Sequence, residues 1–242
     1  MVVTKVEKLE PLPLRKEWMD DLAQAVAFLE SLNLAHGDLR PENILFDRNR
    51  LKLSDFDSTA EIGTNYEACM APYGRMLNSN ETDLGECGTP GFLGPRTEQF
   101  TLGSLFYLIN YGFEVYGDRC LTEDPYEHGP KVVELLQNME FPELDGNPLI
   151  DNIIKKCWHN EFISISGLAA QTRDIRSSDG EATTAEEANG KSCDEAPISL
   201  GEGFTSEKEF CQDLEKRGLL HLLSLGEPEQ IGFTFDWYRH SL

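Results

Sequence analysis

Three polar residues within one short stretch of the sequence have the types and spacing that phosphoryl transfer requires. Asp38 and Asn43 stand five positions apart, and Asp55 follows them closely. Phosphoryl transfer needs an acidic group that orients the attacking hydroxyl, and oxygen ligands for the Mg²⁺ bound to the nucleotide phosphates. Each of these residues alone is an ordinary loop or turn residue in many proteins. The three together at this spacing indicate a phosphotransfer site.

The elements around these residues are predicted to bring them into one cleft. Apolar residues recur at helical spacing from 17 to 33, which predicts a helix with one buried face just before Asp38. Two short strands, 44–46 and 51–54, flank a turn-forming segment and predict a hairpin. Because a hairpin reverses the chain, it returns Asp55 to the side of Asn43.

The two segments, His-Gly-Asp-Leu-Arg-Pro-Glu-Asn and Asp-Phe-Asp, resemble the catalytic loop and the metal-binding segment of eukaryotic-type protein kinases. The resemblance implies that Asp38 is the catalytic base and that Arg40 takes the place of the lysine that steadies the transferred phosphate. It also implies that Asn43 and Asp55 bind Mg²⁺, that ATP is the phosphate donor and that a protein is the acceptor.

Further residues are expected to support this site. His36 and Phe56 belong to the two motifs, and Glu98 follows Thr97, the predicted N-cap of a second apolar helix. By the resemblance, this is the central helix of the kinase fold, and Glu98 replaces an aspartate that braces the backbone of the catalytic loop. Asp57 stands where kinases usually have glycine, and its carboxylate is a further candidate metal ligand.

The sequence also departs from the protein kinase pattern. Gly37 replaces the arginine that in many kinases reads a phosphate on the activation loop, so switching by phosphorylation of that loop is not expected. Only Gly-Pro-Arg at 94–96 stands near the place of the Ala-Pro-Glu motif, and no arginine follows Cys157 and Trp158 to pair with its glutamate. Loss of both partners is coherent, because either charge alone would be left unpaired.

The predicted fold is α+β and mainly α-helical, with a short β hairpin, as in the C-terminal lobe of a protein kinase. Residues 1–171 are assigned to this lobe, with 1–13 as a remnant of the last N-lobe strand and hinge and 36–57 as the catalytic and metal-binding loops. No glycine-rich loop or third-strand lysine precedes Asp38. The N-lobe is therefore expected to be largely absent, and the chain alone to be weakly active or inactive. The pattern is similar to that of divergent kinase-like proteins of filamentous fungi.

Other segments are predicted from composition and helix signals. Residues 58–96 are rich in Gly, Pro, Asn and Thr and form a predicted long loop, functional or disordered. Two more helices are predicted at 130–138 and 148–158. Residues 172–206, acidic and poor in large apolar side chains, are a predicted flexible linker. Residues 207–242 are predicted to form a helix and an aromatic tail that dock on the lobe.

Composition and charge narrow the partners and the compartment. The formal net charge of −22 argues against nucleic acid and anionic membrane surfaces as partners, since both attract clustered Lys and Arg. The six cysteines include no Cys-x-x-Cys pair, which is typical of free thiols in a reducing compartment. No signal peptide or membrane span is predicted. A cytoplasmic or nuclear protein, not a secreted one, is therefore expected.

Three functions are compatible with the sequence. The first is transfer of the ATP γ-phosphate to protein serine or threonine, with Arg40 in Leu-Arg-Pro-Glu-Asn favouring these acceptors over tyrosine. The second is a pseudokinase or scaffold that binds a partner through its exposed interlobe surface. The third is a small-molecule kinase of the aminoglycoside or choline type, because His-Gly-Asp is similar to the motif of those enzymes.

Overall fold

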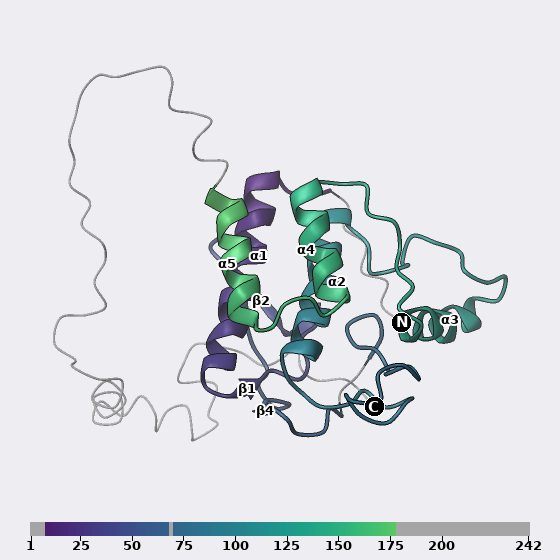
Figure 1. The fold of residues 1–242 in the computed structure, drawn as a ribbon. Coiled ribbons are helices and arrows are strands. Elements are labelled where there is room, and N and C mark those ends of the chain that lie inside the picture. The colour runs from purple at the N-terminus through teal and green to yellow at the C-terminus, as the bar shows by residue number, and fades with distance from the viewer. Residues whose placement is uncertain (1–7, 68–69, 178–242) are drawn as a thin grey trace, which may run out of the picture. The chain divides into compact units, whose positions relative to one another are not determined.

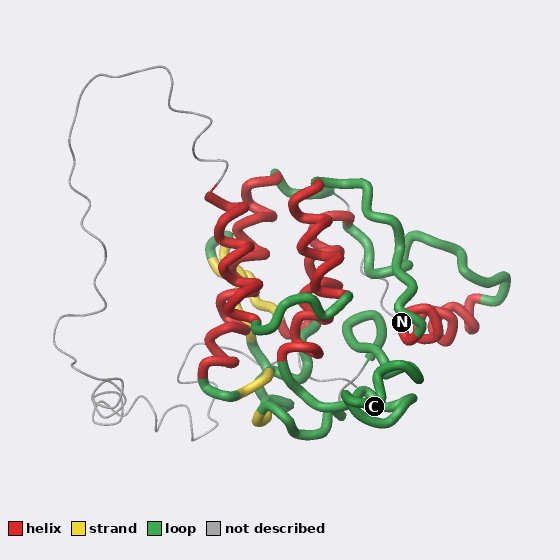
Figure 2. Tube along the Cα trace, in the orientation of Figure 1, coloured by secondary structure: helices red, strands yellow, loops and turns green. Residues whose placement is uncertain are grey.

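The computed structural model describes residues 8–67 and 70–177, all within the first of the chain's two compact units (Figure 1). The described helices are α1 (Leu12–Ser31), α2 (Pro95–Tyr111), α3 (His128–Gln137), α4 (Pro148–Trp158) and α5 (Ile165–Ser177). The described strands are β1 (Leu34–Ala35), β2 (Ile44–Asp47), β3 (Arg50–Leu53) and β4 (Ala60–Glu61), with β1 paired to β4 and β2 to β3. Helix dominates over strand (Figure 2), so the predicted mainly helical fold with a short hairpin is confirmed.

Helix α2 is the central element of the core. Its residues from Thr97 to Leu108 are all buried, as expected for a helix that is apolar nearly all round. Gly103 allows α4 to pack closely, because a Cβ atom at this position would lie only 2.8 Å from the Cβ of Cys157. The indole N–H of Trp158 donates to the Ser104 hydroxyl at 3.3 Å. These contacts hold α4 against α2, the helix that also carries Glu98.

The start of α2 differs from the prediction. The helix begins at Pro95, with Gly94 as the N-cap residue, rather than behind Thr97. Proline suits the first helical turn because its missing N–H has no intrahelical partner there. Thr97 still binds the helix start, since its hydroxyl accepts the backbone N–H of Gly94 at 3.0 Å. The predicted N-cap position was therefore wrong, because Gly94 is the N-cap residue. The Thr97 hydroxyl makes its capping contact from within the first turn of α2.

Helices α1 and α5 lie side by side (Figure 1) and share many contacts. Helix α1 begins at Leu12, earlier than the predicted residue 17, so the last two residues of the predicted segment 1–13 are helical. Helix α5 corrects the predicted start of the linker at 172, because Thr172 and Ile175 are buried and Arg176 pairs with Asp20 at 2.6 Å. The remainder of that linker and the predicted element 207–242 lie outside the described residues.

The predicted hairpin is present, with slightly different bounds. Strands β2 and β3 pair antiparallel from Ile44 opposite Leu53 to Asp47 opposite Arg50. The two turn residues between them, Arg48 and Asn49, have φ of 48° and 70°. Positive φ at both central residues is the geometry that closes a two-residue hairpin without splaying its strands.

The predicted loop 58–96 is largely folded where it is described. It contains β4 and a bridge between Asn65 and Phe92. A second link within the loop is a buried ion pair, in which the Arg75 guanidinium donates to the Glu81 carboxylate at 2.5 and 2.7 Å. The bridge joins residues 27 positions apart and the ion pair joins residues six positions apart, so neither contact is visible in the local composition of the loop.

Two shorter helices complete the described fold. Helix α3 begins at His128 rather than at the predicted residue 130. Helix α4 spans the predicted 148–158, and the Asn147 side chain caps it by accepting the backbone N–H groups of Leu149 and Ile150 at 3.1 and 3.3 Å. Among the described residues, no helix combines the length and apolar character needed to cross a membrane.

Candidate functional site

The catalytic-loop segment is held by a carboxylate from the central helix. Glu98 of α2 accepts the backbone N–H of His36 at 3.0 Å through Oε2 and that of Gly37 at 3.2 Å through Oε1. Burial raises the pKa of Glu98 to about 7, against the opposing effect of these two hydrogen bonds. Glu98 thus binds the backbone of the two residues directly before the candidate base Asp38. This geometry is consistent with the bracing role expected of Glu98.

Asp38 and Asn43 are brought together by the turn between them. The Asn43 amide nitrogen donates to the backbone oxygen of Asp38 at 2.8 Å and to its carboxylate Oδ2 at 2.9 Å. The turn is a short 3-10 helix, Pro41–Asn43, which buries Asn43 to 4% exposure. Because the amide nitrogen faces Asp38, the Asn43 side-chain oxygen is left to face other ligands.

Arg40 lies beside the same carboxylate. Its Nε is 3.2 Å from Asp38 Oδ2, so this oxygen faces both Arg40 and Asn43. The other carboxylate oxygen, Oδ1, has no hydrogen-bond partner in the part of the chain that the structure describes. The arrangement leaves one oxygen of Asp38 open to accept a proton from an incoming hydroxyl.

His36 links the two motifs. It is fully buried, and its ring Nε2 lies 3.0 Å from the backbone oxygen of Ser54, one residue before Asp55. Burial lowers the pKa of His36, while the Ser54 bond and the nearby Asp38 and Asp55 charges oppose that effect. The His36 ring also contacts the Phe56 ring, with centroids 5.3 Å apart. These contacts support the structural roles expected of His36 and Phe56.

The Asp-Phe-Asp segment follows strand β3 directly. The backbone N–H of Ser54 donates to the Asn43 carbonyl at 2.9 Å, which joins the end of the hairpin to the catalytic turn. Asp55 has a φ of 58°, a left-handed conformation that Asp adopts more readily than most residues. Asp57, which stands at the usual glycine position, is not among the residues with positive φ. The left-handed backbone conformation is therefore at Asp55 and not at Asp57.

The donor set at this place is chemically suited to Mg²⁺. Asn43 and Asp55 offer an amide oxygen and a carboxylate, and Mg²⁺ prefers oxygen ligands, keeping several waters and substrate phosphate oxygens besides one or two protein groups. Within 8–67 and 70–177, no cluster of three His, Cys, Asp or Glu residues forms a complete protein-only metal site. Asp57 lines a separate polar hollow together with Gly37 and Ser58.

An acidic group beside the catalytic turn was not foreseen from the sequence. The buried Tyr73 hydroxyl donates to Glu114 at 3.1 Å, and burial raises the pKa of both groups. The charge of Glu42, within the catalytic turn, raises both pKa values further. No motif or spacing connects Glu42 with Glu114, so only the fold could reveal this proximity.

Gln99 of α2 binds the segment that follows α4. This fully buried residue donates from its amide nitrogen to Asn160 Oδ1 at 2.7 Å and to the Phe162 carbonyl at 2.9 Å. Its amide oxygen accepts the Phe162 N–H at 3.1 Å. A neutral side chain therefore binds the segment after α4, the place where the sequence lacked an arginine.

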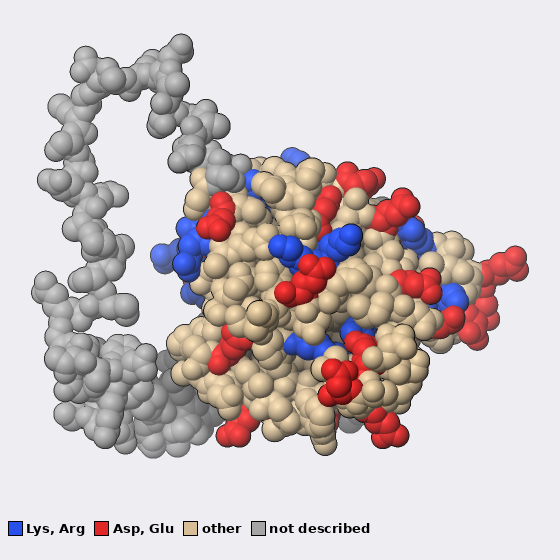
Figure 3. Space-filling view, viewed as in Figure 1, with Lys and Arg blue, Asp and Glu red and all other residues tan. Residues whose placement is uncertain are grey.

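The surface of the described fold carries many acidic groups. On the face shown in Figure 3, Asp and Glu side chains are spread over several elements, while Lys and Arg side chains form smaller groups. This distribution agrees with the formal net charge of −22.

Comparison with known proteins finds similarity to protein kinases. The family described as "Protein kinase domain" matches residues 5–125. The mitogen-activated protein kinase kinase kinase mom-4 of Caenorhabditis elegans is 29% identical over 153 residues, covering 59% of this chain and 25% of that protein. The serine/threonine-protein kinase Sgk1-A of Xenopus laevis is 28% identical over 171 residues, covering 63% and 35%.

A shorter match has higher identity. The liver/testis phosphorylase b kinase gamma catalytic chain of Mus musculus is 40% identical over 79 residues, which is 32% of this chain and 16% of that protein. The matched part of this chain thus spans about a third or less of the length of these relatives.

Proposed function

The chain belongs to the protein kinase domain family, and on this premise we propose that it serves ATP- and Mg²⁺-dependent phosphotransfer to serine or threonine of a protein acceptor. The observation that carries the proposal is the pair of hydrogen bonds from Asn43 to Asp38, which joins the candidate base to a candidate metal ligand. The curated relatives named above are kinases by name, which supports the reaction class.

Each site residue has a proposed role. Asp38 orients the acceptor hydroxyl and takes its proton on Oδ1, while the hydroxyl oxygen bonds to the γ-phosphorus and the bond from that phosphorus to the oxygen of departing ADP breaks. Arg40, beside Asp38, faces the negative charge of the phosphoryl group in transfer. Asn43 and Asp55 would hold Mg²⁺, which when bound neutralises charge on the nucleotide phosphates. Asp57 has no role in this proposed step and lines the separate polar hollow.

The test is phosphotransfer by the longest product that the gene encodes, with casein or myelin basic protein as acceptor and γ-labelled ATP. Asp38→Asn is expected to reduce transfer by about two to four orders of magnitude, because it removes the base. Its free energy of unfolding should change little, since an asparagine oxygen can still accept the bond from Asn43. Asp55→Asn should weaken Mg²⁺-dependent nucleotide binding.

A matched control removes a carboxylate outside the site. Asp47 lies on the hairpin, half exposed, and pairs with Lys52 at 2.6 Å. Asp47→Asn should leave transfer unchanged. Activity in the wild type that survives Asp38→Asn would overturn the role assigned to Asp38.

A partner-binding scaffold is a second candidate, supported by exposed large apolar side chains in and just after the hairpin. Leu45, Phe46 and Phe56 are 55%, 60% and 50% exposed. If no product of the gene transfers phosphate while a partner binds equally to the wild type and Asp38→Asn, this second function is supported instead.

A further inference from the structure

The β2–β3 hairpin carries three cations in a chain whose formal net charge is −22. Arg48, Arg50 and Lys52 stand at alternate positions, all three are exposed, and they line a polar hollow of about 440 Å³ between the hairpin and α1. Lys52 pairs with Asp47 at 2.6 Å, and the side chains of this pair are 61% and 52% exposed. None of these residues takes part in the phosphotransfer step proposed above.

The strongest ion pair of the hairpin leaves its cation on the outside. The Arg50 guanidinium donates to the Asp21 carboxylate through Nε and Nη2. The Asp21 side chain is 2% exposed, whereas the Arg50 side chain is 54% exposed. Glu17 lies 3.8 Å from Arg50 and is partly exposed. Arg48 has no hydrogen bond or ion pair with another described residue, so its charge also faces solvent.

The end of α5 adds two more cations beside the hairpin. Arg176 binds Asp20 at 2.6 Å and remains 45% exposed over a carboxylate that is 4% exposed. Arg50 and Arg176 therefore bind neighbouring residues of α1, whose Cα atoms are about 3.8 Å apart. Figure 3 shows Lys and Arg side chains gathered on the side of the fold formed by α1 and α5. We call the following exposed residues the basic face: Arg48, Arg50, Lys52, Arg173 and Arg176.

The sequence that follows α5 is acidic and starts next to the basic face. Helix α5 ends at Ser177, one residue after Arg176. The next ten residues, 178–187, contain no Lys or Arg and belong to the same compact unit as the described fold. Their acidic residues are Asp179, Glu181, Glu186 and Glu187. Ten residues span at most roughly 35 Å, and a short covalent link gives an effective concentration in the millimolar range.

We propose that the acidic segment 178–187 binds the basic face of the same chain. Its carboxylates accept charge-assisted hydrogen bonds from cations whose inner ends are already held on α1. An acidic peptide of another protein meets the same charges, but it lacks the covalent link that keeps segment 178–187 beside them. Because the hairpin joins Asn43 to Asp55, the bound segment braces the element that separates the two candidate metal ligands.

The test is competition by a separate copy of the segment. A fluorescein-labelled peptide with the sequence of residues 178–187 is added to the full chain at low ionic strength, where exposed charges are least screened. Fluorescence polarisation then gives its affinity for the wild type and for a variant with a neutralised segment: Asp179→Asn, Glu181→Gln, Glu186→Gln and Glu187→Gln. This variant should bind the peptide about three- to tenfold more tightly, because in the wild type the tethered segment already fills the basic face.

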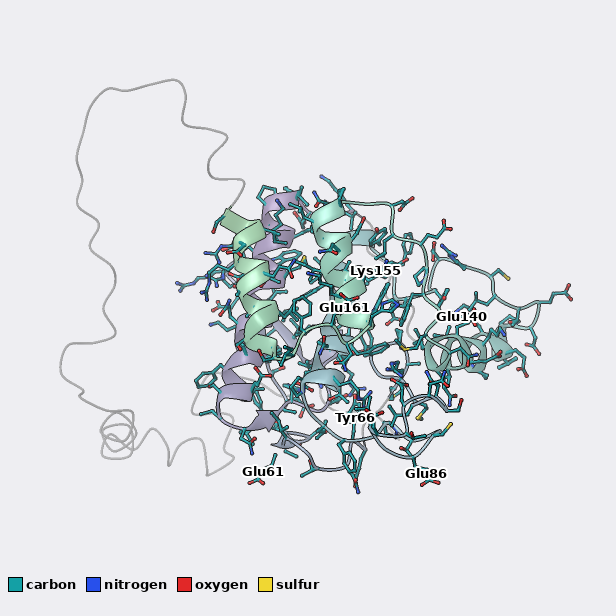
Figure 4. The ribbon with its side chains drawn as sticks, viewed as in Figure 1. Glu61, Tyr66, Glu86, Glu140, Lys155 and Glu161 are labelled. Carbon is teal, nitrogen blue, oxygen red and sulfur yellow. The ribbon has the colours of Figure 1, made fainter. Side chains whose placement is uncertain are left out.

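A control variant separates competition from the general acidic field of the chain. It removes the same number of charges from exposed residues of the described fold, all labelled in Figure 4: Glu61→Gln, Glu86→Gln, Glu140→Gln and Glu161→Gln. A smaller net charge by itself would raise the peptide affinity equally in the two variants. The proposal requires a larger gain in the variant with the neutralised segment.

A second pair of variants locates the binding site. Arg48→Gln with Lys52→Gln, made in the chain with the neutralised segment, should remove most of the gain in affinity. Arg50 is kept, because its bonds to Asp21 hold the hairpin on α1. Arg119→Gln with Lys155→Gln removes two exposed cations outside the basic face and should preserve the gain; Lys155 is labelled in Figure 4.

Each outcome bears on the proposal without involving nucleotide or catalysis. A gain that is specific to the neutralised segment and is lost with the hairpin variant would support it. Equal affinity of the wild type and the neutralised variant would overturn it, and the basic face would then be open to an acidic partner. Equal gains in the two charge-matched variants, or no peptide binding by any of them, would also overturn it.

Discussion

Glu98 on the central helix lies 3.0 Å from the backbone nitrogen of His36, sixty-two residues earlier in the sequence. Together with the bond to Gly37 at 3.2 Å, this contact fixes the backbone that carries Asp38. A buried carboxylate that accepts two backbone N–H groups satisfies donors that the loop cannot satisfy by itself. The central helix therefore positions the site through one side chain.

The first prediction concerns the pH dependence of this contact. Burial raises the pKa of Glu98 from 4.5 to about 7, so the folded state binds its proton more tightly than the unfolded chain does. The stabilisation from this proton is complete below about pH 4.5 and is lost as the pH rises toward 7. The free energy of unfolding of the wild type, relative to Glu98→Gln, should therefore decrease across this window.

Urea unfolding of both proteins between pH 4.5 and pH 8 measures the difference directly. At neutral pH Glu98→Gln should itself cost about 1–3 kcal/mol, because its NH₂ group faces one of the two backbone donors. Glu161→Gln, an exposed change on the loop after α4, provides the control. A difference that stays flat or grows with pH would contradict the assignment.

The second prediction compares two left-handed glycines. Gly37 and Gly63 have φ of 76° and 95°, but a Cβ at Gly37 would lie 2.5 Å from Ser58 oxygen, while nothing lies within 4 Å of a Cβ at Gly63. Gly63→Ala should cost about 1–2 kcal/mol for the left-handed backbone alone. Gly37→Ala should cost more, since Ser58 backbone must also move. Equal losses of unfolding free energy in thermal or urea unfolding would refute the steric argument.

The third prediction tests the corrected boundary of α5. Ile175 is 6% exposed and packs in the core, within the segment that composition assigned to a linker. Ile175→Ala in the full chain should destabilise the protein by about 2–5 kcal/mol, because it leaves a cavity. The adjacent Asp174 is exposed, and Asp174→Ala should change stability by less than about 0.5 kcal/mol. If the two variants unfolded at the same denaturant concentration, the packing of α5 would be in doubt.

Local pattern was enough to predict several features of this fold. The hairpin between Ile44 and Leu53 follows from two short strands around Arg48 and Asn49, and the cap of α4 at Asn147 follows from its side chain and the proline after it. The buried character of α2 follows from apolar residues on all its faces. These features depend on neighbours within a few positions, which is the range over which periodicity and turn chemistry act.

The sequence by itself determined which residues are candidates for chemistry: Asp38, Asn43 and Asp55 are proposed from their type and spacing, and Glu98 from its place at the start of an apolar helix. Only the tertiary structure decided how they are held and what surrounds them. The bond from Glu98 to His36, the proximity of Glu42 to Glu114, and the hollow between Gly37 and Glu67 each join segments that are distant along the chain or have no local motif. Such relationships arise from packing of whole elements, and no local pattern encodes the distance between two side chains that meet only after the helices have packed.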